Sequence, residues 1–196
     1  MASNRIRNVA FLSTYPPREC GLATFTDDLV RELDKVELIN NPKVIAVSDN
    51  DYSYGSRVIM ELKQHERESY TKIAEEINNS DIELLVIEHE YGIFGGEDGE
   101  YILDLAEKIQ IPFILTVHTV LPSPKEKQKK ILEMLGEKSA RVVTMAKNTI
   151  PILEKVYGID PAKIEVIHHG VPYKILEPRE KLKKKFWLEN RTVIST

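Results

Sequence analysis

The chain has 196 residues, of which 42% are apolar and 30% are charged. This length predicts one domain, or one domain and the start of another, with enough apolar residues for a packed core. The formal net charge is −4, from 27 basic and 31 acidic residues, which gives no support for a nucleic-acid-binding surface. No apolar run is long enough to span a bilayer, and residues 1–8 lead into the first strand without a signal-peptide core. The single cysteine cannot form an internal disulfide, so we expect a reducing, cytoplasmic location.

Short apolar runs alternate with segments of helical periodicity. The predicted strands, in chain order, are Asn8–Thr14, Lys43–Ser48, Arg57–Leu62, Glu83–Glu90, Pro112–Val120, Arg141–Ala146 and Lys163–Gly170. Apolar residues at three- and four-residue spacing predict helices at 22–36, 66–80, 102–109, 131–135 and 152–156. The run from Leu84 to Ile87 does not alternate with polar residues, which is typical of a strand in a parallel sheet covered on both faces. The alternation predicts an α/β fold, with a Rossmann-like, doubly wound, mainly parallel sheet and helices on both faces.

The last part of the chain differs in character. Glu177–Asn190 is predicted as a charged helix whose lysines form a solvated face, and Arg191–Thr196 as one more strand. We therefore expect a domain over residues 1–175 and a linker helix over 176–190. Residues 191–196 would then be the first strand of a second domain that this chain does not include.

Polar residues gather where the predicted strands end. Four of the five histidines follow apolar runs in this way: His89, His118, His168 and His169. In an open parallel sheet, ligands bind beyond the carboxyl ends of the strands. Polar residues resume after any strand, but histidine at three ends of one rim predicts a functional cleft.

The turn from Pro16 to Thr26, "PPRECGLATFT", holds features that a plain connection does not need. Gly21 lies between the first strand and the first helix, where glycine lets a ligand come close to the backbone. The free amides and the dipole of a helix start favour an anion. Arg18 either binds that anion in a bidentate way or pairs with Glu19. A second glycine-rich turn, "GIFGGEDG" at 92–99, also precedes a helix.

Several enzyme motifs are absent from the sequence. The chain has no G-x-G-x-x-G after the first strand, no G-x-x-x-x-G-K-[ST] and no G-x-S-x-G, so a dinucleotide cofactor, a P-loop and an α/β-hydrolase site are not expected. Asp49–Asp51 is interpreted as a solvated turn, and the adjacent His168 and His169 would point to opposite faces of a strand rather than to one metal. Cys20 is either a thiol activated near the helix start or, as we prefer, a small packed residue.

Four stretches resemble the N-terminal domain of a family 4 glycosyltransferase of the GT-B fold: "STYPPRECGLATFTDDL", "EHEYGIFGGEDG", "TVHTVLPSP" and "IHHGVP". The resemblance implies two Rossmann-like domains that face each other across a cleft, with the acceptor mainly on the N-terminal domain. It implies transfer of a hexosyl group, with retention, from a nucleotide-diphosphate sugar to a carbohydrate or lipid-linked acceptor, without a cofactor or metal. The E-x7-E glutamate pair of the C-terminal domain is not in this chain, so we expect little or no activity from the chain alone.

The resemblance also implies roles for individual residues. His118 matches the histidine that contacts the transferred sugar, and we predict it as the catalytic residue. Gly21 matches the glycine near the donor phosphates, whereas His89, Glu90 and the Gly95–Gly96 turn match the acceptor-side wall. The predicted donor- and acceptor-binding residues are Arg18, Gly21, His89, Glu90, Phe94, Gly95, Gly96, Thr119 and Gly170. No residue is predicted as a metal ligand.

Two other functions stay open from the sequence. The chain also fits half of a sugar-nucleotide epimerase or of a phosphorylase, which share the two-domain plan. It also fits a stand-alone α/β module that binds a carbohydrate or a partner protein without catalysis.

Overall fold

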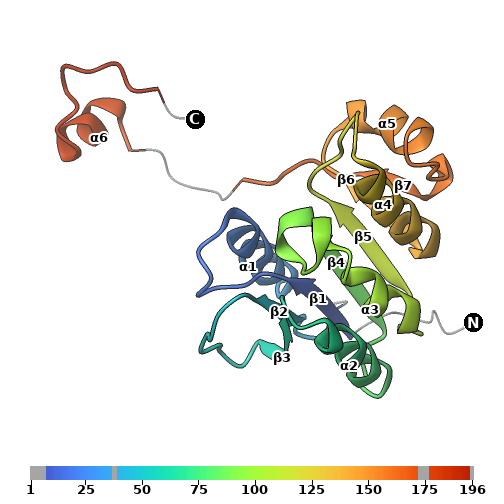
Figure 1. Ribbon diagram of the computed structural model, residues 1–196. Helices are drawn as coiled ribbons and strands as arrows, with labels where there is room; N and C mark the ends of the chain where they lie inside the picture. The colour runs from blue at the N-terminus through green and yellow to red at the C-terminus, as the bar shows by residue number, and fades with distance from the viewer. Residues whose placement is uncertain (1–7, 37–38, 172–176, 195–196) are drawn as a thin grey trace, which may run out of the picture.

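The computed structural model describes residues 8–36, 39–171 and 177–194. In these residues, seven strands form one parallel sheet in the order β3-β2-β1-β4-β5-β6-β7 (Figure 1). The strands are β1 (Val9–Ser13), β2 (Lys43–Ser48), β3 (Val58–Lys63), β4 (Leu84–His89), β5 (Phe113–Val117), β6 (Arg141–Thr144) and β7 (Ile164–Val166). The α-helices are α1 (Gly21–Leu33), α2 (Arg67–Asn78), α3 (Ile102–Lys108), α4 (Glu126–Lys138), α5 (Ile150–Lys155) and α6 (Arg179–Lys185). Short 3-10 turns are η1 (Tyr91–Ile93), η2 (Glu97–Gly99), η3 (Lys147–Thr149) and η4 (Pro161–Lys163).

The sheet separates two hydrophobic cores. On one face, α1 packs against the strands through Val30. On the other face, α2, α3 and α4 bury Ile73, Leu105 and Leu132 against the same sheet. Because helices cover both faces, β1 is buried at every position. β4, which contains the run from Leu84 to Ile87, is likewise buried from Leu85 to His89, so the cover on both faces explains that run.

The order in which the chain adds strands to the sheet reverses next to β1. From β1 it continues to β2 and β3 on one side, and α2 then returns it to β4 on the other side. In open α/β sheets, the crevice beyond the carboxyl ends of the strands at such a reversal is the ligand site. The ends of β1 and β4 and the start of α1 meet at this place.

The predicted α/β fold and the predicted order of elements are confirmed, with shifts at element ends. β2 has the bounds that were expected, and the strand expected at Arg57–Leu62 forms one residue later as β3. β7 is shorter than expected because it pairs only with β6, and that pairing ends at Thr144 and Val166. The histidines at 168 and 169 therefore lie beyond the strand rather than within it.

The predictions for the last part of the chain agree less well. The expected helix at Glu177–Asn190 is reduced to α6, none of whose residues is buried. The strand expected at Arg191–Thr196 does not form at residues 191–194, which have no regular secondary structure. A strand needs a neighbouring strand for its backbone hydrogen bonds, and this segment has none in the described chain. Residues 195–196 and the domain boundary expected at 175–176 lie outside the described residues, at least in part.

The segment that contains α6 lies apart from the sheet (Figure 1). Four of its apolar side chains are exposed: Phe186, Trp187, Val193 and Ile194. Within the part of the chain that the structure describes, no helix is both long enough and apolar enough to cross a membrane.

Candidate active site

Gly21 and His118 lie at one edge of the sheet and are connected through Phe25. α1 begins at Gly21, and Phe25 lies about one helical turn further along it. The ring of Phe25 meets the ring of His118 edge to face, with 5.0 Å between the ring centroids. His118 directly follows the end of β5. The start of α1 and the end of β5 therefore share one rim, which is the arrangement that a common site requires.

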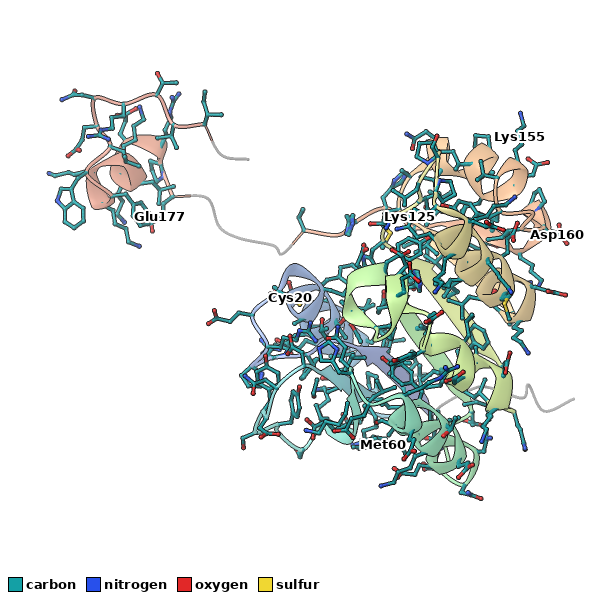
Figure 2. The ribbon with its side chains drawn as sticks, viewed as in Figure 1. Cys20, Met60, Lys125, Lys155, Asp160 and Glu177 are labelled. Atoms are coloured by element: carbon teal, nitrogen blue, oxygen red, sulfur yellow. The ribbon has the colours of Figure 1, made fainter. Side chains whose placement is uncertain are left out.

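The start of α1 is open and carries no acidic residue in its first turn. Cys20, labelled in Figure 2, caps the helix, because its Sγ accepts a hydrogen bond from the Ala23 amide at 3.4 Å. Thr14 Oγ1 lies 3.1 Å from the same sulfur, so these two contacts hold the half-buried Cys20 against the end of β1. A Cβ added at Gly21 would have no atom within 4 Å. The positive end of the helix dipole is thus uncovered and not neutralised, which favours an anion there.

Glu88, near the end of β4, is a buried carboxylate that bonds to His118. Its Oε2 lies 2.8 Å from Nε2 of His118, and Glu88 has no exposed surface. Both residues lie on the sheet face that α1 covers, because Val86 and Ile114, at even spacing before them, pack in the core beneath α1. Oε1 of Glu88 has no hydrogen-bond partner among the described residues. The bond therefore fixes one edge of the His118 ring against the sheet.

His89 lies on the opposite face of β4. Its ring is fully buried between Tyr91, at 4.9 Å between ring centroids, and Phe94, at 5.9 Å. Neither ring nitrogen has a hydrogen-bond partner in the described chain. Burial, with a smaller effect of the nearby His118, lowers the pKa of His89 to about 3. His89 is therefore a neutral ring inside the core, as is the ring of Phe94, and the binding role predicted for both stays a prediction.

Glu90 and Thr119 join the loops after β4 and β5. The Thr119 hydroxyl donates a hydrogen bond to Oε2 of Glu90, and Oε1 of Glu90 accepts one from the Tyr91 amide at 3.0 Å. Both Glu90 and Thr119 are half-buried. The structure thus brings together two residues that the sequence predicts at the binding site, next in the chain to His89 and His118.

The glycine-rich turn after β4 is fixed by hydrogen bonds that connect it to the end of β3. The Gly95 amide donates to the Tyr70 hydroxyl at 2.7 Å, and that hydroxyl donates to the Gln64 carbonyl at 2.9 Å. A Cβ added at Gly95 would lie only 1.9 Å from the same carbonyl oxygen. Gly96 has a φ of +81°, in the left-handed region that favours glycine. Packing therefore accounts for a glycine at position 95, Gly96 is exposed, and the binding roles predicted for both stay predictions.

Arg18 is held by residues distant in sequence. Its guanidinium lies 3.1 Å from the Asp49 carboxylate, 3.2 Å from the Val47 carbonyl and 3.0 Å from Oε1 of Gln64. Only 12% of the Arg18 side chain is exposed. The alternative pairing with Glu19 does not form in the described chain. Arg18 ties the loop after β1 to the ends of β2 and β3, and its predicted contact with an anion stays a prediction.

The last two histidines follow β7 and are exposed. Nδ1 of His168 lies 2.9 Å from a carbonyl oxygen of the loop after β6, so this ring holds the turn. The ring of His169 lies 5.4 Å from Phe25 and 6.3 Å from His118, between centroids. His169 therefore belongs to the cluster around His118, and the exposed Gly170 follows it directly.

The candidate site lies along a rim of the sheet, apart from two hollows of the surface. One hollow of about 680 Å³ lies along β3 and α2, and another of about 250 Å³ lies at the ends of β2 and β3. Neither of the two is lined by Gly21 or His118. Among the residues that the structure describes, no group of three His, Cys, Asp or Glu is arranged to hold a metal.

Sequence reasoning missed two residues of this rim as site residues. Glu88 carried a usable signal, because it is a charge at the end of an apolar strand. Side chains alternate along a strand, so its spacing from Val86 could have placed it beneath α1. Phe25 carried no such signal, since an apolar residue at helical spacing is typical of a core position.

The fold and the rim are those of a Rossmann-like α/β domain. A family model described as Glycosyltransferase Family 4 matches residues 21–174. The match covers most of the chain, and the chain belongs to this family. The resemblance found in the sequence is thereby confirmed. No curated protein matches the sequence.

Two solved structures are similar to the chain. One is the "lipopolysaccharide outer core galactosyltransferase WaaB apo form", with a TM-score of 0.60 and 11% identity over 85% of this chain and 47% of that chain. At this identity the likeness shows the fold alone, and this chain spans only about half of that protein. The other is a short chain dehydrogenase family protein from Francisella tularensis subsp. tularensis SCHU S4, with a TM-score of 0.40 and 13% identity over 80% of this chain and 79% of that chain. A TM-score that low carries no argument.

Proposed function

We propose that the chain is the acceptor-side half of a retaining glycosyltransferase. The reaction moves a hexosyl group from a nucleotide-diphosphate sugar to a hydroxyl of a carbohydrate or lipid-linked acceptor. The contact between Phe25 and His118 carries the proposal, because it joins the anion-favouring start of α1 to an imidazole at one rim. Membership of Glycosyltransferase Family 4 supports the same class of reaction.

The start of α1 suits the diphosphate of the donor. When the glycosidic bond breaks, the leaving diphosphate gains charge, and preorganised amides at a helix start lower the energy of that charge. Gly21 leaves the first turn uncovered, so phosphate oxygens can reach these amides. His118 lies beside the same helix through Phe25, where its ring would contact the sugar that is being transferred.

We further propose that another domain supplies the opposite wall of the cleft. Residues 1–175 would then form one domain, residues 176–190 the linker, and residues 191–196 the start of the next domain. An open rim admits water, which hydrolyses the donor, whereas closure of two domains would exclude it. For this reason little or no transfer is expected from this chain alone. The proposed reaction uses no metal or cofactor, and a single cysteine suits a reducing cytoplasm.

The test is a transfer assay on the whole natural polypeptide, with UDP-hexoses and GDP-hexoses as donors. His118→Ala should lower the transfer rate by about 100-fold or more, because a ring that contacts the reacting sugar is lost. Because His118→Ala also leaves the buried Glu88 carboxylate without its partner, the free energy of unfolding should fall by about 1–3 kcal/mol, and circular dichroism should show that the variant is still folded. His65→Ala is the matched control, because His65 is exposed and lies away from His118 after β3. Unchanged turnover in His118→Ala would refute the role, and the anomeric configuration of the product tests retention.

The other candidate functions give different products in the same assay. An epimerised nucleotide sugar, formed without any acceptor, would indicate an epimerase. A requirement for inorganic phosphate would indicate a phosphorylase. Saccharide binding without turnover, in the whole natural polypeptide, would indicate a binding module and overturn the proposed transfer.

A further inference from the structure

We propose that Glu88 is a positioning residue for His118. It keeps the ring proton on Nε2 and leaves Nδ1 as the free nitrogen, which accepts a hydrogen bond from a hydroxyl of the bound sugar. The placement of the ring stands on the structure alone, whereas the identity of the hydroxyl rests on the proposed function.

The geometry of the pair is that of a charge-assisted hydrogen bond. The distance of 2.8 Å between Oε2 and Nε2 lies in the range of such bonds. A carboxylate oxygen accepts a hydrogen bond, and the proposal places the matching N–H on Nε2 of the ring. The bond that one ring nitrogen makes decides the state of the other nitrogen.

The surroundings leave Nδ1 as the only ring nitrogen for a ligand. Within the described chain, no hydrogen bond to Nδ1 of His118 is formed, and 13% of the side chain is exposed. The ring of Phe25 packs against it from α1, and the ring of His169 lies beside it from the loop after β7. His89 lies on the other face of β4, and its ring nitrogens make no hydrogen bond to Glu88.

This arrangement specifies the chemical class of the group that His118 recognises. A bare Nδ1 accepts a hydrogen bond and therefore suits a hydroxyl, which can donate one. It does not suit a phosphate oxygen, which only accepts at neutral pH. The diphosphate would thus bind at the start of α1, and a sugar hydroxyl would bind at His118. The two ends of the donor would then occupy different places on the same rim.

The first experiment reads the ring itself and needs no turnover. In this chain labelled with nitrogen-15 histidine, at about pH 8, the His118 ring should show a slowly exchanging proton on Nε2 and no proton on Nδ1. Glu88→Gln should lose or shift that Nε2 proton, since an amide can donate as well as accept. Glu165→Gln, the same change at an exposed residue of β7, should leave it unchanged. A proton on Nδ1, or an Nε2 proton that is the same in Glu88→Gln, would overturn the inference.

The second experiment uses the whole natural polypeptide and a donor that it turns over. Glu88→Gln should lower kcat by about tenfold or more with little change in KM, because the ring is misplaced rather than removed. The double variant Glu88→Gln with His118→Ala should be no slower than His118→Ala alone. Additive losses would mean that Glu88 does not act through His118 and would overturn the inference. If no donor is turned over, the proposed function fails, while the ring measurement still decides the role of Glu88.

Discussion

Gly21 and Gly95 were both predicted as binding glycines, and the structure separates them by what surrounds them. We predict that Gly95→Ala destabilises the protein strongly and that Gly21→Ala does not destabilise it. A Cβ at Gly95 would lie 1.9 Å from the Gln64 carbonyl oxygen and 2.8 Å from a ring carbon of Tyr101. The nearest of these is backbone at the end of β3, so it cannot rotate away.

The magnitudes follow from these contacts. Overpacking of this kind costs about 1–3 kcal/mol, and the hydrogen bond from the Gly95 amide to Tyr70 adds about 1 kcal/mol if the loop moves. We therefore expect a loss of about 3 kcal/mol, which lowers Tm by about 6–12 °C in a domain of this size. Gly21 has open space around it and lies in the first turn of a helix, so alanine should be neutral or stabilise by up to about 0.5 kcal/mol.

Urea unfolding of this chain, followed by circular dichroism, measures both differences. The two variants differ from the parent by one methyl group each and serve as controls for one another. If Gly95→Ala were as stable as the parent, the packing of the turn on β3 would not exist as described. In the whole natural polypeptide, Gly21→Ala should lower the transfer rate without loss of stability, because the methyl group lies where the diphosphate is proposed to bind.

Two further predictions concern buried polar groups. Tyr70→Phe removes the hydroxyl between the Gly95 amide and the Gln64 carbonyl and should cost about 2–3 kcal/mol of unfolding free energy in urea titration; a loss below about 0.5 kcal/mol would contradict this. The pKa of His89 is lowered to about 3 in the folded state. When the pH falls below the ordinary pKa of histidine, His89 is therefore protonated in the unfolded chain but not in the folded one, and the free energy of unfolding decreases. Between about pH 7.5 and about pH 5 this loss is about 2 kcal/mol, and His89→Asn should lack it. An equal pH dependence in both proteins would mean that His89 titrates normally when folded.

The fold was predictable because its signals are local. Apolar runs and helical spacing are properties of neighbouring residues, and they placed β2 at its observed bounds and β3 within one residue. The strand expected after residue 190 failed for the opposite reason. A strand exists only through its partners, and the sequence of one segment does not contain them.

The contacts between loops could not be predicted in the same way. Arg18 has Glu19 beside it in sequence, but it pairs with Asp49, because β1 and β2 are neighbours in the sheet and their ends meet. The pairing depends on the strand order, which local patterns do not specify. The same holds for Phe25, whose contact with His118 joins an early helix to a strand that comes much later in the chain.

The stretch from Glu88 to Glu90 shows how far a motif can be assigned as one unit. Successive side chains of β4 point to opposite faces of the sheet. Glu88 therefore lies beneath α1, where it bonds to His118, whereas His89 is buried in the core on the other face. Glu90 lies past the strand and bonds to Thr119. Three consecutive residues of one motif therefore have three different environments. A loss of transfer activity after substitution has a different cause at each of them. At His89 it would report a disturbed core, whereas at Glu90, which is half-buried at the rim, it would report contact with the acceptor if stability were unchanged.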